Sequence, residues 1–268
     1  KVAKWRLQWL LGKARDQFFA DASAEDIPEV GDEEFDAIFS QYDDEVVFVH
    51  VGLSDINTAV TGNPYEFILE RLTDNFETVM GTGYTPTFRS SGIYHKEFSR
   101  PKFGVFSKLF LEDADYRTDD AIHSILVKGD YRFDDYDHHD SFGEAGVRRK
   151  LDEDNVLCLN VGTDSFTCLV FHYLEGIMDL PYVTHPEFDG VIYYDETEYD
   201  HISQRNYRYT NELIGFPWNE AKVRRRLESD GVLHDHSIGD LQILAYRFND
   251  VKEALVPLLE ADPYYLVT

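Results

Sequence analysis

Residues 166–175 read Phe-Thr-Cys-Leu-Val-Phe-His-Tyr-Leu-Glu, so that His172 stands three positions before Glu175 in an apolar stretch. A β-like run over 155–161 precedes it, and the Gly-Thr-Asp-Ser turn between the two can cap a helix. Positions three apart share one face of a helix, so a helix over 166–176 would direct the imidazole and the carboxylate into the same space. Such a pair is a common general base. A buried core histidine with its hydrogen bonds satisfied would give the same pattern.

Strand and helix signals alternate along the rest of the chain. The β-branched run Glu45–Val51 predicts a buried strand, and Asn63-Pro64-Tyr65-Glu66 is a capping sequence for the helix that follows. No linker or repeat divides the chain, so the sequence predicts one compact α/β domain. The other predicted elements are helices near 33–39, 219–229 and 250–261 and strands at 121–128, 155–161, 190–195, 239–248 and 264–267.

Charge is the strongest compositional signal. The chain carries 51 Asp and Glu against 25 Lys and Arg, a net charge of −26. Such a chain is repelled by a phosphate backbone, which argues against nucleic-acid binding. Its apolar fraction is ordinary, so it is expected to fold, and a fold with so much self-repulsion fits best where salt screens it. We therefore expect a cytoplasmic protein of a high-salt, halophile-like cytoplasm, with an ordinary acidic cytosolic protein as the alternative.

The first fifteen residues break this pattern. They carry five cations and no acid, interleaved with Trp and Leu, which leaves −31 on the remainder. We expect an N-terminal helical segment over 1–40 that packs on the acidic body of the chain or on a partner subunit, as in a homodimer. An amphipathic helix on a membrane surface is the alternative.

No stretch of the chain approaches the roughly 18 apolar residues of a membrane span. The two cysteines, Cys158 and Cys168, are predicted to be buried thiols in a reducing compartment.

Four short segments carry a family resemblance. They are VHVGLS (49–54), GTGYTPTF (81–88), RTDDAIHSI (117–125), and TCLVFHYLE (167–175) followed by Leu180-Pro181-Tyr182. In this order and spacing they resemble the patterns hHsSL, GTxxxPTF, RSxHPxxSv and TxxHxxE…vPY of the aminoglycoside 3-N-acetyltransferase family, antibiotic N-acetyltransferases without the GNAT fold. The resemblance runs from about residue 45 to 195. It implies a single large domain, 41–268, with a central mixed β-sheet flanked by helices.

The resemblance implies transfer of an acetyl group from acetyl-CoA to an amine of an amino sugar or aminoglycoside-like acceptor, as in antibiotic resistance. Most amines are protonated at neutral pH, and an ammonium has no lone pair to attack with. His172 is the candidate general base. Glu175 could orient the His172 ring, or it could hold the acceptor's ammonium directly. A backbone N–H or the hydroxyl of Thr82 or Thr167 could stabilise the oxyanion.

Further site residues follow from the same resemblance. Strand-end loops that lead into helices suit the phosphates of CoA. The expected CoA-binding residues are His50, Gly52, Leu53, Ser54, Arg117, His123, Ser124 and Ile125. A structural ion pair is the alternative for Arg117. The expected acceptor-side residues are Tyr84, Asp140, Glu175 and Tyr182.

The acidic loop 134–140, which includes His138 and His139, could bind Zn²⁺ or Mn²⁺. However, a chain this acidic is expected to carry many Asp residues in its solvated loops. The family that the chain resembles also needs no metal. We therefore expect no metal site in this loop.

The chain departs from the family patterns at several positions. Gly52 stands where a serine is usual, Asp120-Ala121 replaces His-Pro, and Val183 and Pro186 stand where relatives from sugar-modification pathways carry Arg and Lys. A catalytically degenerate relative that binds CoA or a sugar without chemistry is therefore the alternative to an enzyme. The missing cations lead us to expect that free amino sugars or aminoglycosides match or outperform nucleotide-linked ones, unless Arg132 or Arg148 takes over the phosphate contact.

Overall fold

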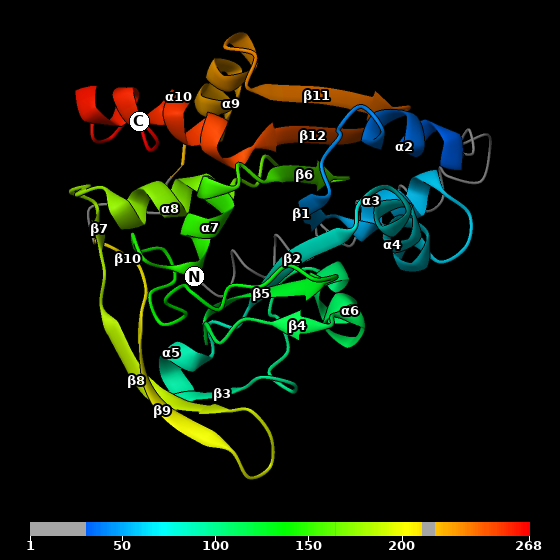
Figure 1. Ribbon diagram of the computed structural model, residues 1–268. Helices are drawn as coiled ribbons and strands as arrows, with labels where there is room; N and C mark the ends of the chain where they lie inside the picture. Colours follow the sequence, from blue (N-terminus) through cyan, green and yellow to red (C-terminus); the bar gives the residue numbers. More distant parts are fainter. Residues whose placement is uncertain (1–30, 164, 211–217) are drawn as a thin grey trace, which may run out of the picture.

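A mixed sheet forms the centre of the protein in the computed structural model, which describes residues 31–163, 165–210 and 218–268 (Figure 1). Its strands are β1 (Val46–Val51), β2 (Thr78–Tyr84), β4 (Tyr116–Arg117), β5 (His123–Lys128), β6 (Leu157–Val161), β11 (Leu233–Ile238) and β12 (Leu241–Arg247). The seven strands follow the order β11-β12-β6-β1-β2-β5-β4. β1 runs parallel to β2 and β6, and the other neighbours are antiparallel. The predicted central mixed sheet is confirmed.

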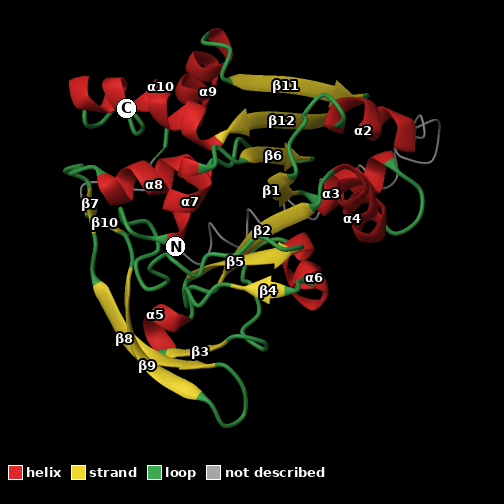
Figure 2. Ribbon diagram, viewed as in Figure 1, coloured by secondary structure: helices red, strands yellow, loops and turns green. Residues whose placement is uncertain are grey.

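Helices cover both faces of this sheet (Figure 2). One face packs against α2 (Asp32–Phe39), α3 (Leu53–Ala59), α4 (Pro64–Asn75) and α6 (Val105–Asp113). The other packs against α7 (Val147–Glu153), α8 (Leu169–Ile177), α9 (Glu220–Ser229) and α10 (Phe248–Ala261). Successive side chains of a strand point to opposite faces, so Val47 and Val49 of β1 enter the first core and Phe48 enters the second. This is why β1 is apolar at nearly every position.

A smaller sheet extends from the domain at the side opposite β11 (Figure 1). It consists of β3 (Ile93–His95), β8 (Glu187–Tyr193) and β9 (Tyr199–Arg205), and the short helix α5 (Phe88–Ser91) packs on it. Its core joins Phe88, Tyr94 and Ile192 to Ala121 and Ile122, which precede β5. The two-stranded pair β7 (Val183–Thr184) and β10 (Arg208–Tyr209) leads the chain back toward α8. The small sheet therefore buttresses the segment that enters β5.

Most predicted elements are confirmed, with two exceptions. The Asn63 side chain caps α4 by accepting from the backbone N–H of Tyr65 at 3.1 Å, as the capping sequence predicts. The helix predicted over 166–176 begins at Leu169 after Cys168, so the preceding Gly-Thr-Asp-Ser turn does not cap it. Residues 264–267 form turns rather than the predicted strand. Strand β11 was not predicted, because its alternation of polar residues carries only a weak apolar signal.

The N-terminal prediction falls largely outside the described residues. Residues 1–30, with their five cations, are not among them. Of the proposed segment 1–40, α2 is described, and it buries Phe35 and Phe39 in the core beside β1. Cys158 and Cys168 are both buried and free, as predicted. Within the described ranges, no helix has both the length and the apolar character needed to span a bilayer.

Candidate active site

Three of the predicted residues meet on the sheet face that α8 covers. His50 of β1, Tyr84 of β2 and His123 of β5 each lie an even number of positions from a residue of the core beneath α7–α10, so their side chains point to that face. His172 reaches the same space from α8, and a pocket of about 430 Å³ lies between them. The pocket is lined by His50, Val51, Thr82, Tyr84, Phe103, Gly104, Ser107, His123, Thr163, Thr167, Cys168, Leu169, His172, Tyr207 and Trp218.

His172 and Glu175 are in contact, as their spacing predicts. His172 Nδ1 lies 3.0 Å from Glu175 Oε2. The hydroxyl of Tyr209 donates to the same oxygen at 3.0 Å, and the indole N–H of Trp218 donates to Oε1 at 2.9 Å. Burial, reinforced by the Glu175 carboxylate, raises the pKa of Tyr209, so its hydroxyl stays protonated and donates. Both carboxylate oxygens therefore have partners.

This arrangement decides which nitrogen of His172 is available. Glu175 is 0% exposed and does not line the pocket, whereas the His172 side chain is 18% exposed. The carboxylate engages Nδ1, which leaves Nε2 for a reactant in the pocket. Of the two roles predicted for Glu175, its burial favours orientation of His172 over direct contact with the acceptor.

Aromatic rings fix the His172 imidazole from several sides. Tyr207 stacks on it with ring centroids 4.2 Å apart, Trp218 meets it edge-on at 4.6 Å, and Phe142 lies at 5.2 Å. Sequence reasoning missed Tyr207, Tyr209 and Trp218. They follow α8 by 30 residues or more. Only the strand-like alternation Tyr-Arg-Tyr at 207–209 hints that two of the rings lie on one side of the chain, and the strand β10 itself begins at Arg208.

Two further imidazoles in the pocket are held neutral. Burial lowers the pKa of His50 to about 4. Burial, and after it the Arg148 guanidinium, holds the pKa of His123 well below its usual value. The Nδ1 atom of His50 and the Nε2 atom of His123 are buried and have no hydrogen-bond partner among the described residues. Three histidines line the pocket. Within the described part of the chain, His172 is the one whose ring nitrogen contacts a carboxylate.

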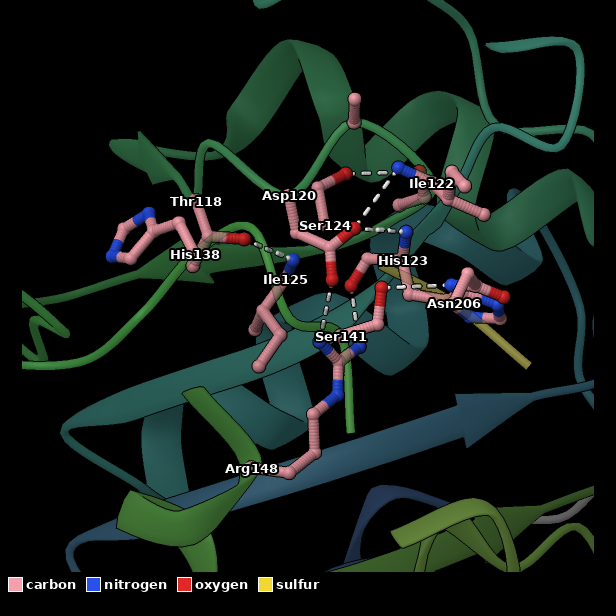
Figure 3. A network of polar contacts seen from close by, with 12 residues as sticks. Thr118, Asp120, Ile122, His123, Ser124, Ile125, His138, Ser141, Arg148 and Asn206 are labelled. Carbon is pink, nitrogen blue, oxygen red and sulfur yellow. Dashed lines mark hydrogen bonds and ion pairs between the residues drawn. The ribbon is translucent and has the colours of Figure 1, made fainter. Parts of the chain in front are cut away.

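A buried ion pair takes the place of the family's His-Pro. Asp120 accepts from the backbone N–H groups of Ile122 at 2.9 Å and His123 at 2.7 Å, and its other oxygen lies 3.2 Å from Arg148 Nη1 (Figure 3). Arg148 also donates to the carbonyl of His123. Both charged side chains are essentially unexposed, at 0% and 1%. The departure from the family pattern at Asp120 is therefore an organised structural element.

Gly52 is required by close backbone contact. It is the N-cap of α3, and its N–H donates to the carbonyl of Val161 at 2.9 Å. A Cβ atom at this position would lie 1.8 Å from the carbonyl oxygen of Gly162. A serine there would overlap with the backbone of the neighbouring loop.

We expect Gly52→Ser, which restores the residue usual in the family, to destabilise this protein by about 1–3 kcal/mol, because the loop at Gly162 must shift. Gly31→Ser is the matched control, since a Cβ at Gly31 meets nothing within 4 Å. Urea unfolding of the two variants checks this. A Gly52→Ser protein as stable as the wild type would show that the loop at Gly162 yields without cost.

Several side chains that are predicted to bind CoA are buried or hydrogen-bonded to other parts of the protein. Arg117 is 4% exposed, and it donates to the carbonyls of Lys96 and Ser99 at 2.8 Å, to that of Gly83 at 3.2 Å and to Ser124 Oγ at 2.9 Å. Its donors are occupied by the protein, which favours the structural alternative for Arg117 over contact with a phosphate. Ser124 and Ile125 are fully buried, and neither residue lines the pocket.

The remaining predicted residues lie near the pocket but not in its wall. Gly52, Leu53 and Ser54 follow the pocket residue Val51 at the start of α3. Asp140 is bound to Arg205 at 2.9 Å, and Tyr182 is fully buried, so neither side chain is part of the wall of this pocket. Within the described ranges, no three His, Cys, Asp or Glu side chains are grouped to hold a metal ion.

Comparison with known proteins identifies the family. The family model described as aminoglycoside 3-N-acetyltransferase matches residues 48–260. No curated protein matches the chain in sequence. Among solved structures, AAC-IIIb in its binary complex with CoASH is similar, with a TM-score of 0.67 and 15% identity over 86% of this chain and 96% of that one.

Two other structures have the same fold. A mutant of the aminoglycoside acetyltransferase AAC(3)-IVa in complex with apramycin has a TM-score of 0.65 and 15% identity over 90% of this chain and 96% of that one. The YokD protein from Bacillus subtilis has a TM-score of 0.67 and 12% identity over 88% and 95%. Identity this low establishes the fold, whereas the sequence model spans most of the chain. The protein therefore belongs to the aminoglycoside 3-N-acetyltransferase family, which consists of acetyl-CoA-dependent N-acetyltransferases.

Proposed function

We propose that this protein transfers the acetyl group of acetyl-CoA to an amine of an amino sugar or aminoglycoside-like acceptor, with His172 as general base and Glu175 as the group that orients it. The observation that carries this proposal is the buried Glu175 carboxylate, bound by Tyr209, Trp218 and His172 at 2.9–3.0 Å. A carboxylate in this position fixes the ring and stabilises the imidazolium that forms during proton transfer. It favours orientation of His172 over direct contact with the acceptor.

The reaction follows from this geometry. The amine nitrogen attacks the thioester carbonyl carbon while His172 Nε2 takes a proton from it. The carbonyl electron pair moves to oxygen and returns as the carbon–sulfur bond breaks. CoA leaves as a thiolate and takes the proton back from His172, so the products are an N-acetyl amide and CoA thiol. Proton and charge are balanced, and the base is regenerated.

The pocket has the character that a pantetheine arm requires. Val51, Leu169 and Phe103 give it apolar walls, and it lies where β1 and β2 end, beside the first turn of α3. The prediction that His50, Gly52, Leu53 and Ser54 bind CoA is supported by this position at the strand ends. AAC-IIIb, which shares the fold, was solved with CoASH bound.

A catalytically degenerate relative is the alternative function. Its basis is the set of departures at Gly52, Asp120-Ala121, Val183 and Pro186. Of these, Gly52 and Asp120 have a structural explanation in this chain. Release of free thiol from acetyl-CoA in the presence of a panel of amines, measured in molar KCl, decides between the two. Failure to release thiol with any amine, while CoA still binds, would support the binding protein.

Three arginines of the chain, at positions 132, 148 and 205, are engaged by the protein itself. Arg148 is bound by Asp120, and Arg205 is bound by Asp140. Arg132 donates to two backbone carbonyls. These contacts argue against any of the three replacing the cations that are missing at positions 183 and 186.

We expect a free amino sugar or aminoglycoside to match or outperform the nucleotide-linked form of the same sugar in kcat/KM, because a phosphate would find no free cation among these arginines. Arg208 is exposed on β10, opposite Thr184 of β7. Arg208→Gln therefore tests whether this exposed cation contributes a phosphate contact. A 100-fold preference of the wild type for the nucleotide-linked form, about 2.7 kcal/mol, would contradict the expectation.

We also propose a high-salt cytoplasm as the setting, on the basis of the net charge of −26. Screening weakens repulsion among the acidic side chains, so the melting temperature is expected to climb between low and molar KCl. Sucrose at equal osmolality is the control, because it is excluded from the surface without screening charge. Melting temperatures that do not depend on KCl would count against this setting.

A further inference from the structure

We infer that His123 is a second catalytic residue, whose imidazole donates a hydrogen bond to the acetyl carbonyl oxygen as the tetrahedral intermediate forms. This role rests on the proposed transfer reaction. It differs from the CoA contact that the family resemblance implies for the segment around His123, because it acts on the reacting atoms.

The first observation is an unpartnered nitrogen. His123 lines the pocket, its residue is 8% exposed, and its Nε2 atom is buried without a hydrogen-bond partner among the described residues. A buried polar group without a hydrogen-bond partner destabilises the folded state. Such a group in a native structure calls for an explanation, and a ligand atom in the pocket would satisfy this one.

The second observation is the placement of the ring relative to the base. The centroids of the His123 and His172 rings are 6.1 Å apart across the same pocket. A reacting centre between them can lie within hydrogen-bond reach of both, as acyl transfer needs. The amine would face His172 Nε2, and the carbonyl oxygen of the thioester would face His123.

The third observation is the way the fold fixes His123. Its N–H donates to Asp120 at 2.7 Å and its carbonyl accepts from Arg148, so a buried ion pair holds both sides of its peptide backbone (Figure 3). Tyr84 and Phe142 pack on the ring at 4.4 and 4.8 Å. A donor that is fixed in advance stabilises a developing oxyanion most effectively, because it needs no reorganisation during the reaction.

The ring is also in the right protonation state. Burial and the nearby Arg148 lower the pKa of His123 far enough that the imidazole is neutral at physiological pH. It therefore does not compete with His172 for the proton of the amine. In the tautomer with the proton on Nε2, it donates a hydrogen bond and keeps that proton, and a neutral imidazole polarises a carbonyl in this way in other enzymes.

The balance of the reaction is unchanged by this role. The carbon–nitrogen bond forms, the carbonyl pair moves to the oxygen that His123 contacts, and the pair returns as CoA thiolate leaves. The amine proton moves to His172 and then to the thiolate. His123 neither gains nor loses a proton.

The test is a set of variants at this position. His123→Phe keeps a flat ring without a donor, and His123→Gln places an amide N–H near the position of Nε2. Loss of one oxyanion donor typically lowers kcat by about 10²–10³-fold. We expect that loss for His123→Phe with a KM for acetyl-CoA within a few-fold of wild type, and partial recovery of kcat for His123→Gln. Melting temperatures and the dissociation constant for CoA are measured in parallel.

Matched controls address the competing donors. Thr82 and Thr167 also line the pocket, so Thr82→Val and Thr167→Val remove a hydroxyl at nearly constant volume. A large loss of kcat in one of these variants, with His123→Phe unaffected, would overturn the inference in favour of that threonine. A rise in the acetyl-CoA KM and dissociation constant of His123→Phe with unchanged kcat would overturn it in favour of a simple CoA contact.

Failure of the inference can be told apart from failure of the proposed function. An inactive wild type means that the transfer reaction itself is wrong. An active wild type with an inactive His172→Ala variant and a fully active His123→Phe variant means that only the role of His123 is wrong. If His123→Phe unfolds, the comparison of His123→Gln with His123→Asn takes its place, because asparagine cannot extend an N–H to the Nε2 position. Equal kcat in those two variants would then overturn the inference.

Discussion

His172→Ala is expected to lower the turnover number by roughly 10²–10⁴-fold, the contribution usual for a general base, while CoA binds with nearly unchanged affinity. Without the imidazole, the amine must lose its proton to water during attack. The turnover number is measured from thiol release at saturating acceptor, and the affinity for CoA is measured by calorimetric titration. His201→Ala, which changes an exposed histidine on β9, is the control.

Two outcomes would contradict this expectation. Wild-type turnover with a verified acceptor would remove His172 from the chemistry. An unfolded His172→Ala protein would instead make His172 a core residue, held in place by the packing of Tyr207 and Trp218 against its ring. Glu175→Gln refines the result: if Glu175 orients the ring, kcat falls and the acceptor KM changes little.

Asp120→Ala is expected to lower the free energy of unfolding by about 3–5 kcal/mol, because it leaves the Arg148 charge buried without compensation. Arg148 is 1% exposed, and its other contacts include the carbonyl of His123 and the ring of Phe142. Asp120 also satisfies the N–H groups of Ile122 and His123, so their hydrogen bonds are lost as well. Urea unfolding followed by circular dichroism measures the change.

A surface pair and a double variant complete the experiment. Asp230→Ala removes the partner of Arg226 on α9, a solvent-exposed pair with a 2.6 Å contact, and should change the free energy of unfolding little, because solvent screens the pair. Replacing the buried pair with apolar residues, Asp120→Leu with Arg148→Met, is expected to recover much of the loss, since no charge remains buried. If Asp120→Ala costs no more than Asp230→Ala, the buried pair does not hold this part of the fold.

The sequence carried information wherever the interacting residues are close along the chain. The β-branched run of β1, the capping of α4 by Asn63 and the contact of His172 with Glu175 depend on neighbours within four positions. For such contacts, the period of a strand or a helix determines which side chains meet. The four ordered motifs also identified the family, and the family in turn predicted the mixed sheet and the transfer of an acetyl group.

The tertiary structure decided what depends on distant residues. Tyr209 and Trp218 reach Glu175 across 34 and 43 positions, and no local pattern at α8 predicts them. Arg117 matched the pattern of a phosphate ligand, but the carbonyls of a separate loop accept from its guanidinium.

Gly52 and Asp120 looked like losses relative to the family pattern. The first is required by the backbone at Gly162 and the second by the charge of Arg148. The reason is the same in each case: local periodicity determines which way a side chain points, but the partner it meets there is supplied by the packing of elements far apart in the chain.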